Sequence, residues 1–201
     1  DILLHAAGSG VTSAGIQIAR LLGARRILVT AGSEAKLARA RELGATHGIL
    51  YNQGDFVRAA RDATQGEGVD VVFDHVGGET FERSLKLLKR GGRIVLCGAT
   101  SGPEAKINLR ALFFKQLSVL GSTMGSLAEL ASLLPYFESG ALRPVVDRTF
   151  PLAEAPAALA NRIDADLDHT QLGSSAWIEL PNGYPHVAEV LGADADGWPV
   201  V

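Results

Sequence analysis

The stretch HAAGSGVTSAGIQIARLLGA, residues 5–24, follows a short apolar run and decides how the chain is expected to fold. Its glycines and serines form a turn, and apolar residues three and four positions apart predict a helix from Ser13 to Leu22. A strand, a turn and a helix in this order direct backbone N–H groups and the positive end of a helix dipole at one point, which favours an anion. The stretch therefore predicts either a phosphate-binding turn or a plain turn that needs small residues.

The glycines of this turn match the known dinucleotide-binding motif only in part. That motif is G-x-G-x-x-G, in which the glycines permit a tight turn and a close approach of the backbone to phosphate. Gly8 and Gly10 supply the first two glycines, but Ser13 stands where the third would be. The motif by itself leaves both interpretations open, and the elements around it favour the phosphate-binding one.

Predicted strands and helices alternate along most of the chain. The strands are rich in Val, Ile and Leu without polar alternation, which is typical of parallel strands buried on both faces. Short connections predict right-handed crossovers and a doubly wound α/β Rossmann fold with the strand order 3-2-1-4-5-6. The predicted strands are 1–7, 25–31, 47–51, 69–77, 93–99 and 117–124, and the predicted helices are 13–22, 34–43, 55–66, 79–92 and 127–140.

Two helices carry clear boundary signals. Ser33 and Asp55 are expected to cap the helices that follow them, and Gly44 is expected to end the first of the two. After about residue 151 the pattern weakens, although 152–163 is a helix candidate and 174–181 a strand candidate. We therefore expect a nucleotide-binding domain over residues 1–160. Residues 161–201 are expected to be either a remnant of a catalytic domain or a tail.

The composition excludes several classes of function. The 201 residues are 47% hydrophobic with a net charge of −3, so no basic surface favours nucleic acid. No apolar stretch reaches the roughly 20 residues that span a bilayer, so no membrane partner is expected. Cys97, the single cysteine, is expected in the core and permits no disulfide framework, which favours the cytoplasm. The five histidines lack metal-ligand spacing, so no zinc site is expected within the chain.

Several blocks of the sequence resemble, in the same order, the medium-chain dehydrogenase/reductase superfamily. The resemblance is strongest to its quinone oxidoreductase-like and zinc-type alcohol dehydrogenase members, and it covers roughly residues 1–160. The blocks are HAAGSGVTSAGIQIARLLGA, TAGSEAKLARARELGA, GVDVVFDHVGGETFERSLKLLKRGGRIVLCGATSG, KQLSVLGSTMGS and GALRPVVDRTFPLAEAPAAL.

The turn of that family reads A-x-x-G-V-G, and its last glycine lets the helix approach the first strand. In this chain Thr12 replaces that glycine, which implies a slightly wider approach or a hydroxyl near the pyrophosphate. The resemblance assigns the turn to cofactor binding through Ala7, Gly8, Ser9, Gly10, Val11 and Thr12.

The end of the second predicted strand bears on the choice of cofactor. NAD-specific Rossmann domains place Asp or Glu there, against the ribose 2′-hydroxyl, whereas this chain has Ala31. Gly32 leaves room, and Ser33 and Lys36 can supply a hydrogen bond and a positive charge to a 2′-phosphate. Tyr51 matches a family tyrosine near the adenosine phosphate. These residues predict NADP(H) over NAD(H), unless Ser33 only caps its helix and Lys36 is only a solvated side chain.

The nicotinamide half is expected beyond the fourth and fifth strands, because ligands bind at the carboxyl ends of parallel strands. The candidates there are Val76, Gly77, Gly98 and Ala99. Beside them, His75 is either a residue that orients the cofactor or substrate or a plain loop histidine, and the second interpretation is favoured; Asp74 is as readily a brace for the loop.

The resemblance implies an NADPH-binding domain of a quinone oxidoreductase-like enzyme. Such an enzyme transfers a hydride between the nicotinamide and a quinone, enone or carbonyl substrate, and the protein orients and polarises the reactants. In the family the substrate pocket also needs an N-terminal GroES-like domain, so this chain is expected to be incomplete for catalysis. No catalytic residue is assigned.

Two alternatives stay open: the cofactor domain of a zinc-dependent alcohol dehydrogenase, and a non-catalytic nucleotide-binding or dimerisation module. The predicted strand 117–124 is expected at the sheet edge. Because such edges pair in dimers of this family, we expect a homodimer through Ser118–Met124.

Overall fold

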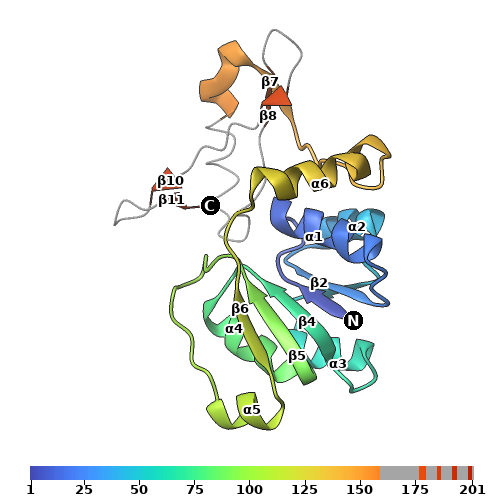
Figure 1. Ribbon diagram of the computed structural model, residues 1–201, viewed down its shortest axis with the longest axis vertical. Coiled ribbons are helices and arrows are strands. Elements are labelled where there is room, and N and C mark those ends of the chain that lie inside the picture. The colour runs from blue at the N-terminus through green and yellow to red at the C-terminus, as the bar shows by residue number, and fades with distance from the viewer. Residues whose placement is uncertain (159–176, 180–184, 187–191, 194–198, 201) are drawn as a thin grey trace. The chain divides into compact units, whose positions relative to one another are not determined.

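The computed structural model describes residues 1–158, 177–179, 185–186, 192–193 and 199–200. The chain divides into two compact units, Asp1–Arg143 and Pro144–Val201. The first unit contains a six-stranded sheet in the order β3-β2-β1-β4-β5-β6, which confirms the order predicted from the sequence (Figure 1). Its neighbouring strands pair in parallel, and they are β1 (Ile2–Leu4), β2 (Ile27–Ala31), β3 (His47–Leu50), β4 (Val69–Asp74), β5 (Leu88–Leu96) and β6 (Ser118–Gly121).

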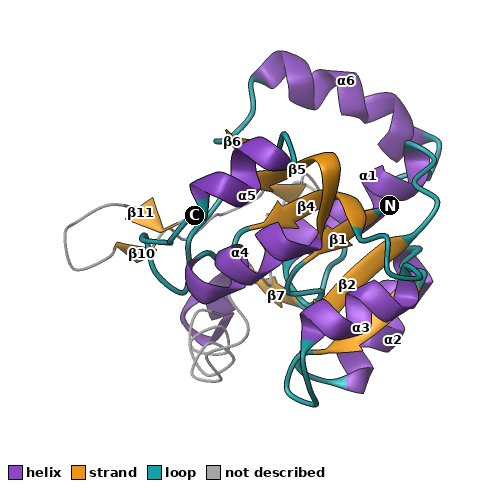
Figure 2. Cartoon of the chain, turned by 90° about the horizontal axis from the view of Figure 1, so that it is seen from below, coloured by secondary structure: helices purple, strands orange, loops and turns teal. Residues whose placement is uncertain are grey.

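Helices cover both faces of this sheet. Leu3 and Leu4 are adjacent in β1 and fully buried. Their side chains belong to separate core clusters because successive side chains of a strand point to opposite faces of the sheet. The Leu3 cluster includes α3 and α4, whereas the Leu4 cluster includes α1 and α2, and Figure 2 shows strands between α4 and α1. The helices are α1 (Gly10–Leu21), α2 (Glu34–Leu43), α3 (Phe56–Ala63), α4 (Gly78–Ser84), the 3-10 helix η1 (Leu85–Leu87), α5 (Leu109–Phe114) and α6 (Leu127–Glu138).

The boundary signals at Asp55, Ser33 and Gly44 lie where the structure begins α3 and begins and ends α2, but Ser33 does not cap its helix. Asp55 caps α3 by accepting a hydrogen bond from the Val57 amide at 2.9 Å, and Gly44 ends α2 with a left-handed φ of 119°. Ser33 occupies the N-cap position of α2, but its side chain makes no capping hydrogen bond. The capping role expected of Ser33 is therefore wrong.

The predicted helix over 79–92 is also wrong in its second half. The chain leaves helix after η1 and enters β5 at Leu88, which pairs with Val69 of β4. The register shifts between Val69 and Val71, and Gly91 takes a left-handed φ of 74°, so the two glycines lie in an irregular stretch of the strand. Pairing with β4 overrides the helical pattern here.

Two further features differ from the sequence-based expectations. The short helix α5 was not predicted. Cys97 comes directly after the last residue of β5 and is only partly buried, so its expected place in the core is wrong.

The second unit contains short strands. β7 (Thr149–Pro151) pairs in parallel with β8 (Trp177–Glu179), which pairs antiparallel with β9 (Pro185–His186). β10 (Gly192–Ala193) and β11 (Pro199–Val200) form an antiparallel pair. The strand candidate at 174–181 corresponds in its described part to β8. Of the helix candidate at 152–163, Leu152–Glu154 form the 3-10 helix η2, residues 155–158 are helical, and the rest lies outside the described residues.

Candidate functional site

The turn between β1 and α1 brings several backbone amide groups to the carboxyl ends of the parallel strands. β1 ends at Leu4, and α1 begins at Gly10 after Ser9, whose hydroxyl oxygen accepts a hydrogen bond from the Thr12 amide at 3.0 Å. The first amides of a helix have no partner within the helix. The first turn of α1 contains no acidic residue, so nothing in that turn repels an anion.

Side chains from α2 and the end of β3 lie against two glycines at these strand ends. A Cβ atom added to Gly8 would lie 3.1 Å from Cδ of Lys36, and one added to Gly32 would lie 2.7 Å from the Tyr51 hydroxyl. Asn52, which the sequence analysis missed, donates a hydrogen bond to the Gly32 carbonyl at 2.9 Å. The structure therefore brings together the predicted residues at the ends of β1, β2 and β3.

The end of β2 carries no carboxylate. Ala31 is its last residue and is buried. Glu34 lies in the first turn of α2, where its exposed carboxylate pairs with Arg41 at 3.5 Å. The strand end that selects for a ribose hydroxyl in NAD-specific domains is therefore apolar in this chain.

The loops after β4 and β5 pack tightly on each other. Asp74 is fully buried, and its Oδ1 atom accepts hydrogen bonds from the amides of Val76 at 2.7 Å and Gly77 at 3.3 Å, as expected for a brace. A Cβ atom on Gly77 would lie 3.0 Å from Cα of Ala99, and one on Gly98 would lie 3.1 Å from the His75 carbonyl oxygen. A side chain at either glycine would force its neighbour to shift by a few tenths of an ångström.

Ser101 fixes the second of these loops over the first. Its amide and its hydroxyl both donate to the Val76 carbonyl, at 2.8 and 2.7 Å. Ser101 was not predicted, because a serine in a glycine-rich loop gives no distinctive signal. The four residues predicted for the nicotinamide half thus lie in a loop pair that is held together by backbone and hydroxyl hydrogen bonds.

His75 is not the plain loop histidine that the sequence suggested. It is 7% exposed, and its Nε2 atom lies 3.1 Å from Oγ of Ser9 and 3.2 Å from Oγ1 of Thr12. Burial lowers the pKa of His75, although the nearby Asp74 and a hydrogen bond to the His5 backbone act in the opposite direction. His75 therefore links the loop after β4 to the turn after β1.

Thr12 lies at the contact between the first turn of α1 and the chain just after β1. Its side chain is buried, and its hydroxyl donates to the His5 carbonyl. The close approach of the helix occurs at Gly15, where an added Cβ atom would lie 2.6 Å from Cδ2 of Leu4. Gly15 thus permits a tight contact between α1 and β1.

A fully buried histidine lies beneath the turn. The ring nitrogens of His5 lie 3.0 Å from Oγ1 of Thr30 and 2.8 Å from Oγ of Ser84. Burial lowers the pKa of His5 to about 4, although the charge of Asp74 raises it. His5 is a neutral structural group at physiological pH.

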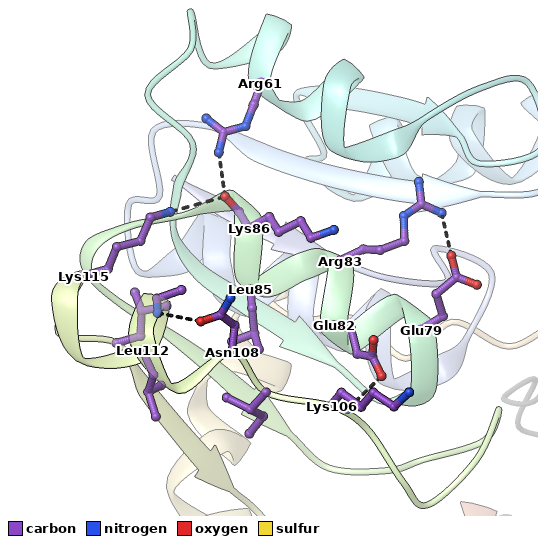
Figure 3. A pocket seen from close by; sticks show the side chains of 13 residues that line it. Arg61, Glu79, Glu82, Arg83, Leu85, Lys86, Lys106, Asn108, Leu112 and Lys115 are labelled. Carbon is purple, nitrogen blue, oxygen red and sulfur yellow. Dashed lines mark hydrogen bonds and ion pairs between the residues drawn. The ribbon is translucent and has the colours of Figure 1, made fainter.

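A pocket of about 820 Å³ lies apart from these strand ends, beside α4, η1 and α5 (Figure 3). It contains none of the predicted site residues. Several of its charged groups already have partners: Arg61 donates to the Lys86 carbonyl at 2.6 Å, and Arg83 pairs with Glu79 at 3.6 Å.

Within the described part of the chain, no group of three or more His, Cys, Asp and Glu residues could hold a metal ion. No helix in that part is long and apolar enough to cross a membrane.

Comparison with known proteins assigns the family. Residues 10–139 match the family model of the zinc-binding dehydrogenases. The chain belongs to this family. A quinone oxidoreductase of Pseudomonas aeruginosa is 35% identical to this chain over 166 residues, which are 78% of this chain and 51% of that protein. The resemblance to quinone oxidoreductase-like members of the medium-chain dehydrogenase/reductase superfamily is thereby confirmed.

Solved structures of the family have the same fold. An NAD-dependent alcohol dehydrogenase is 41% identical with a TM-score of 0.78, over 90% of this chain and 51% of that chain. The Escherichia coli quinone oxidoreductase in complex with NADPH is 31% identical with a TM-score of 0.72, over 89% and 56%. The chain therefore spans about half the length of these relatives, and it is an oxidoreductase-family domain of the nicotinamide-binding type.

Proposed function

We infer that this chain is the NADPH-binding domain of a quinone oxidoreductase-like enzyme, which transfers a hydride between the nicotinamide and a quinone, enone or carbonyl substrate. The observation that carries this proposal is the position of Lys36 against Gly8, beside a strand end that has Ala31 in place of a carboxylate. A cation there attracts a 2′-phosphate, and no carboxylate at the strand end repels it.

The residues present fit such a cofactor along its length. Gly10 and Val11 begin α1, and their amides would bind the pyrophosphate, while Gly32, Ser33 and Tyr51 would lie at the adenosine end. The loops that contain Val76, Gly77, Gly98 and Ala99 would form the nicotinamide end. When bound, the cofactor supplies the hydride chemistry, and this chain supplies binding and orientation.

The test is calorimetric titration of the 201-residue chain with NADPH and with NADH, repeated on Lys36→Glu. Loss of a charge-assisted hydrogen bond, together with a new repulsion, is expected to weaken NADPH binding by about 10- to 100-fold. NADH binding should change little, because NADH lacks the 2′-phosphate. Lys86→Glu is the matched control. Lys86 lies just before the start of β5 and therefore near the amino ends of the strands, away from the proposed phosphate site.

Equal losses for the two cofactors in Lys36→Glu would contradict the assignment of the phosphate site. Failure of the wild-type chain to bind either cofactor would contradict the proposed function as a whole.

A zinc-dependent alcohol dehydrogenase is the second candidate. The NAD-dependent alcohol dehydrogenase described above is more similar in sequence to this chain (41% identical) than the quinone oxidoreductase in complex with NADPH is (31% identical). Metal analysis of the full-length protein separates the two candidates, since stoichiometric zinc together with preferential NADH binding would favour the alcohol dehydrogenase.

A homodimer through β6 is the proposed assembly. β6 lies at the edge of the sheet, and Val119 and Leu120 are 38% and 44% exposed. Pairing of this edge with a second copy would satisfy its backbone groups and cover these apolar side chains.

A further inference from the structure

Three polar side chains meet beneath the turn that joins β1 to α1. Ser9 and Thr12 come from the start of α1, and His75 comes from the loop after β4. Nε2 of His75 lies 3.1 Å from the Ser9 hydroxyl oxygen and 3.2 Å from that of Thr12. All three residues are buried, so their hydrogen-bond partners must come mainly from the protein or a ligand.

The Thr12 hydroxyl has one proton, and the structure determines where it goes. Its oxygen lies against the carbonyl of His5, and a carbonyl can only accept. The proton of Thr12 is therefore donated to His5. Toward His75, Thr12 presents only a lone pair.

This lone pair determines the tautomer of His75. A bare Nε2 atom would face the lone pair of Thr12 without a proton between them, whereas a protonated Nε2 donates to it. Burial lowers the pKa of His75, which keeps the ring neutral near pH 7, so the ring carries a single proton. That proton lies on Nε2.

This tautomer determines how the Ser9 hydroxyl is hydrogen-bonded. The single proton on Nε2 is shared between the Thr12 and Ser9 oxygens in a three-centre hydrogen bond. The Ser9 oxygen thus accepts from the Thr12 amide at 3.0 Å and from Nε2 of His75 at 3.1 Å, so both lone pairs are used. Its own proton remains available for an acceptor at the N-terminus of α1. Ser9 is 4% exposed, so few water molecules can reach it in competition.

We propose that Thr12 and His75 are positioning residues that orient the Ser9 hydroxyl as a donor to the pyrophosphate of the cofactor. This proposal rests on the proposed function, because the acceptor is the pyrophosphate. It also gives Thr12 a role in place of the glycine of its relatives: the hydroxyl acts inward on His75, not directly on the ligand.

The first readout needs no cofactor. The ¹⁵N chemical shifts of the His75 ring, assigned by comparison with His75→Gln, report which nitrogen is protonated. The wild-type chain should show the Nε2–H tautomer. Thr12→Val removes the hydroxyl with little change of shape and should shift the ring toward Nδ1–H, because Ser9 can then donate to Nε2.

The second readout is affinity. Thr12→Val and Ser9→Ala should each weaken NADPH and NADH by the same factor, about tenfold, since both cofactors contain the pyrophosphate. Thr12→Ser should restore both the tautomer and the affinities. Ser13→Ala is the matched control, because Ser13 is a buried neighbour in the same helix turn that does not contact His75, and it should change neither readout.

An Nδ1–H ring in the wild-type chain would overturn the proposal, and so would unchanged affinities in Ser9→Ala. These failures are distinct from failure of the proposed function, in which the wild-type chain would bind neither cofactor. Loss of affinity for NADPH alone would also count against the proposal, because it would place the effect at the 2′-phosphate.

Discussion

Mild acid is expected to destabilise this protein through His5. The ring is 2% exposed, both of its nitrogens lie within hydrogen-bond distance of hydroxyl groups, and its edge packs on Phe56 with the ring centres 5.2 Å apart. Burial lowers the pKa of His5 from 6.5 to about 4. A proton therefore binds the unfolded chain more readily than the folded one.

The sign and size of the effect follow from this difference. Between pH 6.5 and pH 4 the unfolded chain binds a proton that the folded chain does not, so stability falls as the pH falls through that range. At 1.36 kcal/mol per pKa unit, the loss reaches about 3 kcal/mol near pH 4. His75, whose pKa burial also lowers, adds to the loss in the same direction. Asp55 and Asp70 have pKa values held below 3.8 by Arg83 and the N-terminal amine respectively, so their contributions are lost at lower pH.

The assay is urea unfolding followed by circular dichroism from pH 7.5 to pH 4.5 at constant ionic strength. The free energy of unfolding should fall across this range in the wild type, and His5→Asn should show a clearly smaller fall from a lower starting value. His47→Gln is the control, because its ring is not fully buried, and it should keep the wild-type pH dependence. An unchanged pH dependence in His5→Asn would refute the argument.

Three further outcomes are expected. Gly15→Val should lower the free energy of unfolding by about 1–3 kcal/mol through its clash with Leu4, whereas Ala14→Val, exposed on the same helix, should cost less than about 1 kcal/mol; equal losses in thermal melts would contradict this. Ser126→Ala removes the capping box of α6 and should cost about 1 kcal/mol, seen as faster amide hydrogen exchange in the first turn of that helix; unchanged exchange would speak against the cap. Leu120→Lys should convert the proposed dimer to a monomer in light scattering, and a monomeric wild type would refute the β6 interface.

The sequence by itself determined the architecture. Apolar runs separated by helical patterns predicted the six parallel strands, and the right-handed crossover rule reduced the possible strand orders to a few, of which the doubly wound order 3-2-1-4-5-6 was the one expected. The resemblance then identified the family from ordered blocks, and the residue types at the end of β2 were available without coordinates. These features are local or follow from general chirality, so a one-dimensional pattern can contain them.

The tertiary structure decided what depends on contacts between distant segments. Residues 88–92 follow a helical pattern, yet they join β5 because β4 offers a partner strand. His75 looked like a loop residue, and only the packing of β4 beside β1 places it against Ser9, 66 positions earlier in the chain. Lys36 reaches Gly8 for a similar reason, since β2 pairs with β1 and the first turn of α2 follows the end of β2. Hydrogen-bond partners of buried polar groups are fixed by the fold as a whole, so the sequence offered candidate site residues but not the hydrogen-bond network that joins them.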